Sequence, residues 1–297
     1  MQRTLRRITI IMGAALALAG GQAALGAAAV HAAGPPNGPQ PANVYVDDNT
    51  FTLYVMAGPG FANDIKVITE GEDHVVTDKA VTPIAGNGCH VEFVQAPSPN
   101  KIVCDGDKVK FLYVDLGDGY DHLGVRGTLF TVPTTLNGGP GNDTIEGGDG
   151  DDAINGGPGN DTMIGWWGDD QFSGGTEIDT VSYGSMPYSI HADADGAHGD
   201  DGAVGLEADT IMPDVEHIIG GKGDDILAGN EAPNLLVGGP GIDVLIGDAG
   251  DDVLLGEEGY DYLFGVDRDT LRPPPDTNDT CLLGADGGEA YGCANVR

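Results

Sequence analysis

The sequence predicts an all-β chain built around a parallel solenoid, in which short strands stack along one axis. Glycine and aspartate recur every nine residues over two stretches, 138–182 and 220–264, and a short fixed period is typical of architectures in which each unit stacks on its neighbours. Composition agrees with this fold class. The 297 residues include 50 glycines and only 6% aromatics, which leaves few large apolar side chains for an ordinary globular core.

The chain begins with the pattern of an export signal at residues 1–33. Three arginines precede an apolar stretch at 8–25, and small residues follow at Ala32 and Ala33, as in a cleavable leader. A retained membrane helix is the alternative, but the stretch is rich in alanine and glycine and lacks stop-transfer charge. Later segments are too short or too polar to span a bilayer. We therefore expect a secreted protein without a membrane span.

The next two segments are a linker at 34–42 and a β-rich N-terminal segment at 43–136. The linker reads GPPNGPQPA, a composition typical of flexible spacers. The segment after it alternates β-branched and aromatic runs, such as 51–55 and 109–114, with turn residues. It ends in DLGDGYDHL at 115–123, whose glycine and aspartate spacing is compatible with the first coil of the solenoid.

The repeats form two arrays of five nonapeptides. The first array, 138–182, reads GGPGNDTIE, GGDGDDAIN, GGPGNDTMI, GWWGDDQFS and GGTEIDTVS, and the second, 220–264, reads GGKGDDILA, GNEAPNLLV, GGPGIDVLI, GDAGDDVLL and GEEGYDYLF. Glycines at positions one, two and four suit a tight turn with positive φ values. The last three positions form a short strand whose eighth residue points inward. These inward residues are Ile145, Ile154, Met163, Phe172, Val181, Leu227, Leu236, Leu245, Leu254 and Leu263.

An inter-array β segment at 183–219 and a tail at 265–297 complete the chain. The inter-array segment contains strand-like patches at 188–191 and 215–219. The four cysteines fall as two local couples, Cys89 with Cys104 and Cys281 with Cys293. Disulfides in both couples would suit an oxidising compartment and would close the tail, with four free thiols as the alternative.

An acid occupies position six of nearly every unit. If two units make one coil, residues eighteen apart stack with a separation of about 4.8 Å, so that these carboxylates form files. Unit charges this close repel by about 1 kcal/mol in water and by more in a buried turn. A dication that bridges two carboxylates turns this repulsion into a net attraction. Carboxylate and carbonyl oxygens in a flexible turn suit Ca²⁺ better than Mg²⁺.

These units resemble the repeat-in-toxin (RTX) nonapeptide G-G-x-G-x-D-x-U-x, a Ca²⁺-binding β-helix repeat. The chain layout is also similar to that of secreted bacterial calcium-binding proteins of this class. The resemblance implies a right-handed parallel β-roll or β-helix in which turn carbonyls and position-six aspartates bind the ion. The metal ligands that it implies are Asp143, Asp152, Asp161, Asp170, Asp179, Asp225, Asp243, Asp252 and Asp261.

Some units depart from the repeat pattern. Asn234 replaces the acid in a unit that also lacks two glycines, while Trp166 and Glu177 take the second and fourth glycine positions of their units. We expect a weaker site at Asn234 and altered turns before Asp170 and Asp179.

Calcium is expected to control folding. A site with a dissociation constant of about 10⁻⁴ M contributes about 1.4 kcal/mol at about 10⁻³ M free Ca²⁺. About six such sites would supply about 8 kcal/mol, the stability of a typical domain. The alternative is a metal-free solenoid whose acidic turns are solvated.

Catalysis is not expected, and no catalytic or organic-cofactor residues are assigned. The sequence contains no G-x-S-x-G, H-E-x-x-H or phosphate-loop motif. The run from His191 through Asp193 and Asp195 to His198 offers a transition-metal alternative, although a polar loop is the commoner role. The alternative function is a secreted hydrolase with a site in the N-terminal β-rich segment, against the favoured structural or adhesive role.

Charge and surface pattern limit the partners. A net charge of -34 disfavours nucleic acid and anionic lipid and favours cations. Outward positions are mostly polar in the first array and apolar in the second. This apolar face predicts burial within the chain, self-association or a cell-surface partner. The export signal predicts an extracellular location, and such a partner would place the protein at the cell surface.

Overall fold

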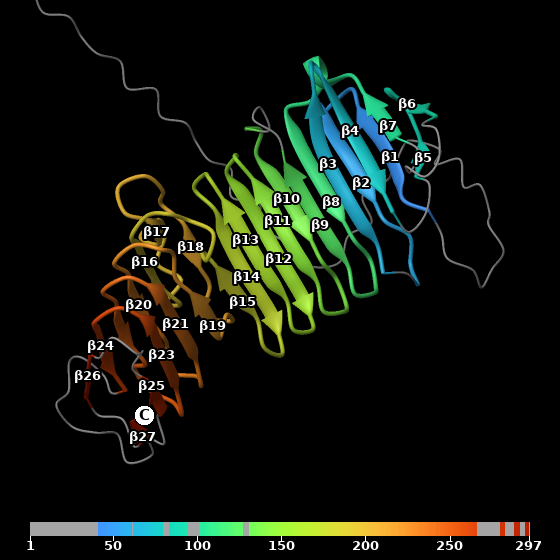
Figure 1. The fold of residues 1–297 in the computed structure, drawn as a ribbon. Helices are drawn as coiled ribbons and strands as arrows, with labels where there is room; N and C mark the ends of the chain where they lie inside the picture. The colour runs from blue at the N-terminus through green and yellow to red at the C-terminus, as the bar shows by residue number, and fades with distance from the viewer. Residues whose placement is uncertain are drawn as a thin grey trace, which may run out of the picture. The chain divides into compact units, whose positions relative to one another are not determined.

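Most strands in the part of the chain that the structure describes are parallel and stacked in register (Figure 1). The computed structural model describes residues 41–60, 62–79, 83–93, 101–126, 131–265, 280–282, 288–291 and 295–296. The predicted export signal, most of the linker and Cys293 lie outside these residues. Within them, no helix is long and apolar enough to cross a membrane.

The strands form three sheets. Sheet A contains, in spatial order, β18 (Thr210–Ile211), β14 (Gln171–Thr176), β12 (Asp152–Pro158), β10 (Thr134–Asn137), β8 (Phe111–Asp115), β2 (Thr52–Met56), β1 (Asn43–Asp47) and β5 (Ile84–Ala85). Sheet B contains β27 (Asn295–Val296), β25 (Thr280–Leu282), β23 (Val253–Glu258), β21 (Leu235–Pro240), β19 (His217–Ile219), β15 (Thr180–Ser182), β13 (Thr162–Trp166), β11 (Thr144–Gly148), β9 (His122–Arg126), β3 (Asp64–Glu70), β4 (Asp73–Asp78), β7 (Lys101–Cys104) and β6 (Cys89–Glu92). Sheet C contains β17 (Gly202–Ala203), β16 (Ile190–Asp193), β20 (Ile226–Ala228), β22 (Val244–Ile246), β24 (Asp261–Phe264) and β26 (Gly288–Tyr291). A 3-10 turn, Gly106–Lys108, lies between β7 and β8.

The arrays have the predicted register of two nonapeptides per coil. Ile145 of β11 pairs with Met163 of β13, and Leu227 of β20 pairs with Leu245 of β22. All ten position-eight residues are buried, with at most 2% of their surface exposed. This alternation confirms the all-β parallel roll, because one apolar side chain per short strand fills the space between the sheets.

In the regular units, glycine at position four allows the turns to stack closely. Gly159 has a φ of 139°, and a Cβ there would overlap the carbonyl oxygen of Gly141 in the neighbouring coil. A side chain would therefore meet both strain and a backbone clash.

The inter-array segment continues the roll. Thr180 of β15 pairs with His217 of β19, 37 residues later, and His217 pairs in turn with Leu235 of β21. Sheet B thus passes unbroken from one array to the other. The additional residues of this long coil form β16, β17 and β18, where sheet A ends and sheet C begins.

The N-terminal β-rich segment supplies the first coils and a cap. Strands β2 and β3 pair in parallel with β8 and β9, which pair with β10 and β11. Antiparallel pairs β1–β2, β3–β4 and β6–β7 lie at the end of the stack. The Cys89–Cys104 disulfide joins β6 to β7. Cys281 is also disulfide-bonded, and Ala42, at the end of the predicted linker, is buried in the core.

Candidate metal centre

The position-six aspartates lie at the turns and are buried. Each of the nine has at most 2% of its surface exposed. Burying an ionised carboxylate without compensation is costly, so each group needs strong hydrogen bonds, a proton or a cation. These side chains therefore determine whether the roll is stable.

One carboxylate oxygen of these side chains links successive coils. The Asp161 Oδ1 atom accepts a 2.7 Å hydrogen bond from the backbone N–H of Asp143, and Asp179 Oδ1 accepts one of 2.8 Å from Asp161. On the opposite edge, Asp170 Oδ1 accepts a 2.9 Å bond from the N–H of Asp152. The second array repeats this pattern from Asp225 through Asp243 to Asp261 and from Asn234 to Asp252. The predicted files are thus present, and each carboxylate lies directly above the next.

The second carboxylate oxygen faces the glycine turn. In Asp143, Asp161, Asp179 and Asp243, Oδ2 is buried without a hydrogen-bond partner among the described residues. A Cβ placed on Gly138 would lie 2.6 Å from Asp143 Oδ2 and 2.5 Å from the carbonyl oxygen of Gly156 in the next coil. Carboxylate and carbonyl oxygens therefore converge on the same turn, a donor set that fits Ca²⁺.

Burial raises the carboxyl pKa values in these turns. The pKa rises to about 7 for Asp143, Asp152 and Asp179, first through desolvation and then through nearby acids. For Asp170, desolvation followed by the charges of Asp152 and Asp209 raises the pKa to about 9. Without a cation, the folded turns thus favour protonated carboxyls.

Three further acids extend the files beyond the repeats. The Asp121 Oδ1 atom accepts a 2.6 Å bond from the N–H of Asn63, and Asp121 N–H donates to Asp143. Asp209 and Glu216 accept the N–H groups of Asp170 and Asp179, respectively. The GDGYD sequence that ends at Asp121 indicated such a turn. Asp209 and Glu216 lack the glycine pattern, so only the strand register identifies them.

The irregular units keep the stacking by other means. The N–H of Asn234 donates to Asp252 Oδ1 at 2.9 Å, while its amide Nδ2 donates to the Glu216 carbonyl at 3.0 Å. Trp166 and Glu177 adopt the positive φ values of the glycines that they replace. The Trp166 indole N–H donates to Glu146 at 3.2 Å, and Arg126 lies over its ring. Neighbouring contacts therefore support the unusual turns.

The run containing two histidines does not form a mixed histidine and aspartate cluster. Ligand oxygens of Asp193, Asp195 and Asp200 lie within 4.8 Å of one another. The His198 Nδ1 atom instead lies 3.1 Å from Thr210 Oγ1, and His191 is exposed on β16. The structure thus gathers the two acids of this run with Asp200, without the histidines of the run.

A parallel roll with files of buried carboxylates at glycine turns defines a calcium-binding β-roll protein. The family model of the RTX calcium-binding nonapeptide repeat matches the chain in four copies, at residues 134–163, 146–181, 214–232 and 229–263. Comparison with curated proteins found no match. The chain therefore contains RTX calcium-binding nonapeptide repeats, and Ca²⁺ is the ion that repeats of this kind bind.

Proposed function

We propose that Ca²⁺ binds between successive turns and that this binding drives folding of the two arrays. The proposed side-chain ligands are Asp143, Asp152, Asp161, Asp170, Asp179, Asp225, Asp243, Asp252 and Asp261. The folded protein then acts outside the cell as a rigid, non-catalytic structural or adhesive module.

The observation that carries this proposal is the buried Oδ2 atom of the position-six aspartates. It has no hydrogen-bond partner among the described residues in four of them, and at Gly138 it lies beside the same glycine as a carbonyl oxygen of the next coil. A buried polar atom without a partner costs about 1–3 kcal/mol, and more when it carries charge. A calcium ion at each turn would convert this cost into a stabilising contact between coils.

Two features support a location outside the cell. The first is the export-signal pattern of residues 1–33. The second is the Cys89–Cys104 disulfide, which is typical of oxidising compartments. Extracellular calcium is abundant enough to fill sites of modest affinity, so calcium-dependent folding after export follows from this placement.

An adhesive role is supported by the outer face of the second array. Ile226 and Tyr262 each leave more than a third of their surface exposed, and with Val244, Ile246 and Phe264 they line a shallow apolar hollow. Exposed apolar patches usually mark contact surfaces. The described residues thus leave an outer face available to a second protomer or to a cell-surface partner.

A calcium titration of the full chain tests the proposal. Far-UV circular dichroism should gain β signal with Ca²⁺ but not with Mg²⁺. Asp152→Asn should raise the calcium midpoint because it removes a buried ligand charge. Asp151→Asn is the matched control, since it removes an equal charge at the adjacent exposed position.

Equal midpoints for the Asp152 and Asp151 variants would contradict the assignment of position six as a ligand. A β signal of full strength in chelator would contradict gated folding.

A further inference from the structure

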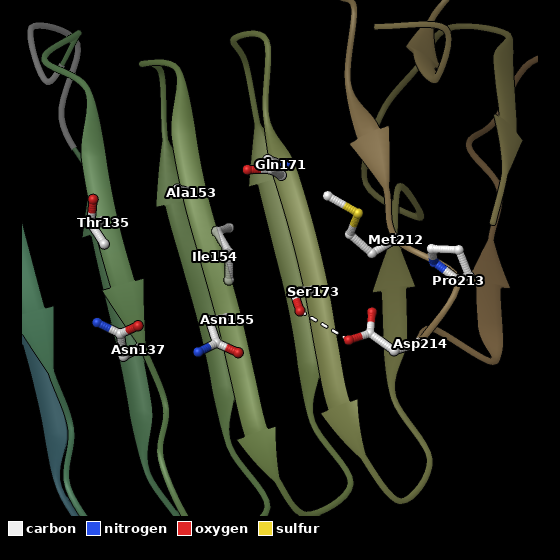
Figure 2. Close-up of a pocket in the computed structure, with 10 residues that line it drawn as sticks. All are labelled: Thr135, Asn137, Ala153, Ile154, Asn155, Gln171, Ser173, Met212, Pro213 and Asp214. Atoms are coloured by element: carbon white, nitrogen blue, oxygen red, sulfur yellow. Dashed lines mark hydrogen bonds between the residues drawn. The ribbon is translucent and has the colours of Figure 1, made fainter. Parts of the chain in front are cut away.

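The outer face of sheet A contains a groove that the calcium turns do not use. Its volume is about 630 Å³, within the range of small-molecule and cofactor pockets. Outward side chains of β10, β12 and β14 form its base, and the residues after β18 form a wall at one end (Figure 2).

Two rows of side chains cross the groove from strand to strand. One row consists of Asn137, Asn155 and Ser173, which are successive partners in the strand register (Figure 2). In the other row, Ala153 lies between Thr135 and Gln171. Neighbouring strands are about 4.8 Å apart, so polar groups repeat at that interval. The small Ala153 side chain leaves the space between its two larger neighbours open.

Asp214 makes the end wall rigid. Its carboxylate accepts hydrogen bonds from Ser173 Oγ at 2.9 Å, from the Gly174 N–H at 3.1 Å and from the Gly175 N–H at 3.2 Å. These three donors fix the side chain and offset its charge. Met212 and Pro213 add an apolar surface beside it.

The groove retains unused hydrogen-bonding groups. Asn155 and Gln171 are exposed, and their amides make no hydrogen bond with other described side chains or backbone. Each amide offers two donor hydrogens and an acceptor oxygen. A ligand here would meet free amides at the spacing of the strands and the apolar surface of Met212 and Pro213 at the end wall.

We propose that this groove binds a neutral polysaccharide that runs across the strands of sheet A. A sugar ring combines apolar C–H faces with hydroxyls that both donate and accept hydrogen bonds, and its length is similar to the strand spacing of about 4.8 Å. Successive sugars would therefore meet successive strands. The net charge of -34 disfavours anionic polysaccharides. An extended peptide would instead pair with a sheet edge, whereas this groove lies on a sheet face.

Calorimetry on the calcium-loaded full chain tests the proposal with neutral hexasaccharides of glucose, xylose and N-acetylglucosamine, beside a hexamer of galacturonate. At least one neutral probe should bind, and the galacturonate hexamer should bind more weakly. Ala153→Leu should abolish binding by filling the groove. The double variant Asn155→Ala with Gln171→Ala should weaken binding by about tenfold or more, because two hydrogen bonds are lost.

Thr162→Leu is the control, because it adds similar bulk to an outward position of β13 in sheet B. It should leave saccharide binding unchanged. Circular dichroism in calcium identifies any variant that fails to fold, and the double alanine variant, which adds no bulk, keeps the test decisive if Ala153→Leu does not fold. The proposal is overturned by a lack of binding to every neutral probe at about 10 mM, by tighter binding of galacturonate, or by unchanged affinity in the folded variants.

Discussion

The N-terminal cap (residues 42–126) and the two arrays use different forces to hold similar stacked strands. In the cap, several strands bury two inward apolar residues, such as Leu53 and Val55 in β2 or Ile65 and Val67 in β3. In the arrays, each strand buries one inward apolar residue at position eight, and every turn also buries a position-six side chain. Fully burying one such apolar side chain is worth about 1.5–3 kcal/mol. The cap thus gains more apolar burial per strand. The arrays depend more on hydrogen bonds, protons or cations that offset the cost of burying their carboxylates.

The largest loss of stability is expected from a side chain added where the backbones of the arrays stack closely. Gly159→Ala should reduce the free energy of unfolding in calcium by more than about 3 kcal/mol, because its Cβ would clash with the next turn. Gly71→Ala in the cap should cost only about 1 kcal/mol, since that glycine also has a positive φ but open space around it. Urea unfolding monitored by circular dichroism measures both. Equal costs would show that the turns can separate.

The effect of removing one carboxylate charge on the stability of the arrays should have opposite signs with and without calcium. Asp161→Asn keeps an oxygen that can accept the N–H of Asp143 but loses a ligand charge. In calcium it should destabilise the arrays by about 2 kcal/mol, and in chelator at pH 8 it should stabilise them by about 1 kcal/mol.

Asp78→Asn in the cap is the matched control for Asp161→Asn, because Asp78 is also a buried acid. Its effect should be the same with and without calcium. A loss of stability of equal size for Asp161→Asn in both conditions would argue against a calcium ligand at this position.

Low pH should partly replace calcium in stabilising the arrays. The folded pKa values of Asp143, Asp152, Asp170 and Asp179 are raised to between about 7 and about 9. The folded state therefore binds more protons than the unfolded state, and this contribution is lost as pH rises through those values. In chelator, thermal unfolding should show greater stability at pH 5 than at pH 8.

In calcium the pH trend should reverse, because protonation competes with the ion for the same oxygens. A chelated protein that is more stable at pH 8 than at pH 5 would contradict the raised pKa values.

Asn234→Asp should have the smallest effect. It restores the acid to the irregular unit and should tighten calcium binding by up to about tenfold, since affinity rises with ligand charge. Without calcium it should reduce stability slightly, because the Asn234 amide bond to the Glu216 carbonyl is lost. Calcium calorimetry measures the first effect. Unchanged affinity would place this turn outside the set of binding turns.

The sequence predicted the periodic part of the structure well. The nine-residue period alone was enough to place the inward residues and the files of aspartates, because each unit repeats one turn and one strand. The continuous path of sheet B through β19 could not be predicted in the same way. Its coil spans 37 residues between Thr180 and His217, and no period relates their sequences.

The ends of the files were partly predictable. Asp121 follows two glycines at the spacing of a repeat, so its turn was visible in the sequence. Asp209 and Glu216 take the same role through strand register alone. The groove beside Asp214 also depends on that long coil, and its lining residues are ordinary polar residues in the sequence.

Amide hydrogen exchange with and without calcium tests the central claim most directly, because it reports on the arrays and on the cap separately. We expect β11, β13, β20 and β22 to lose protection in chelator at neutral pH, while β2, β3 and β8 remain protected. Arrays that stay as protected in chelator as in calcium would contradict calcium-dependent folding.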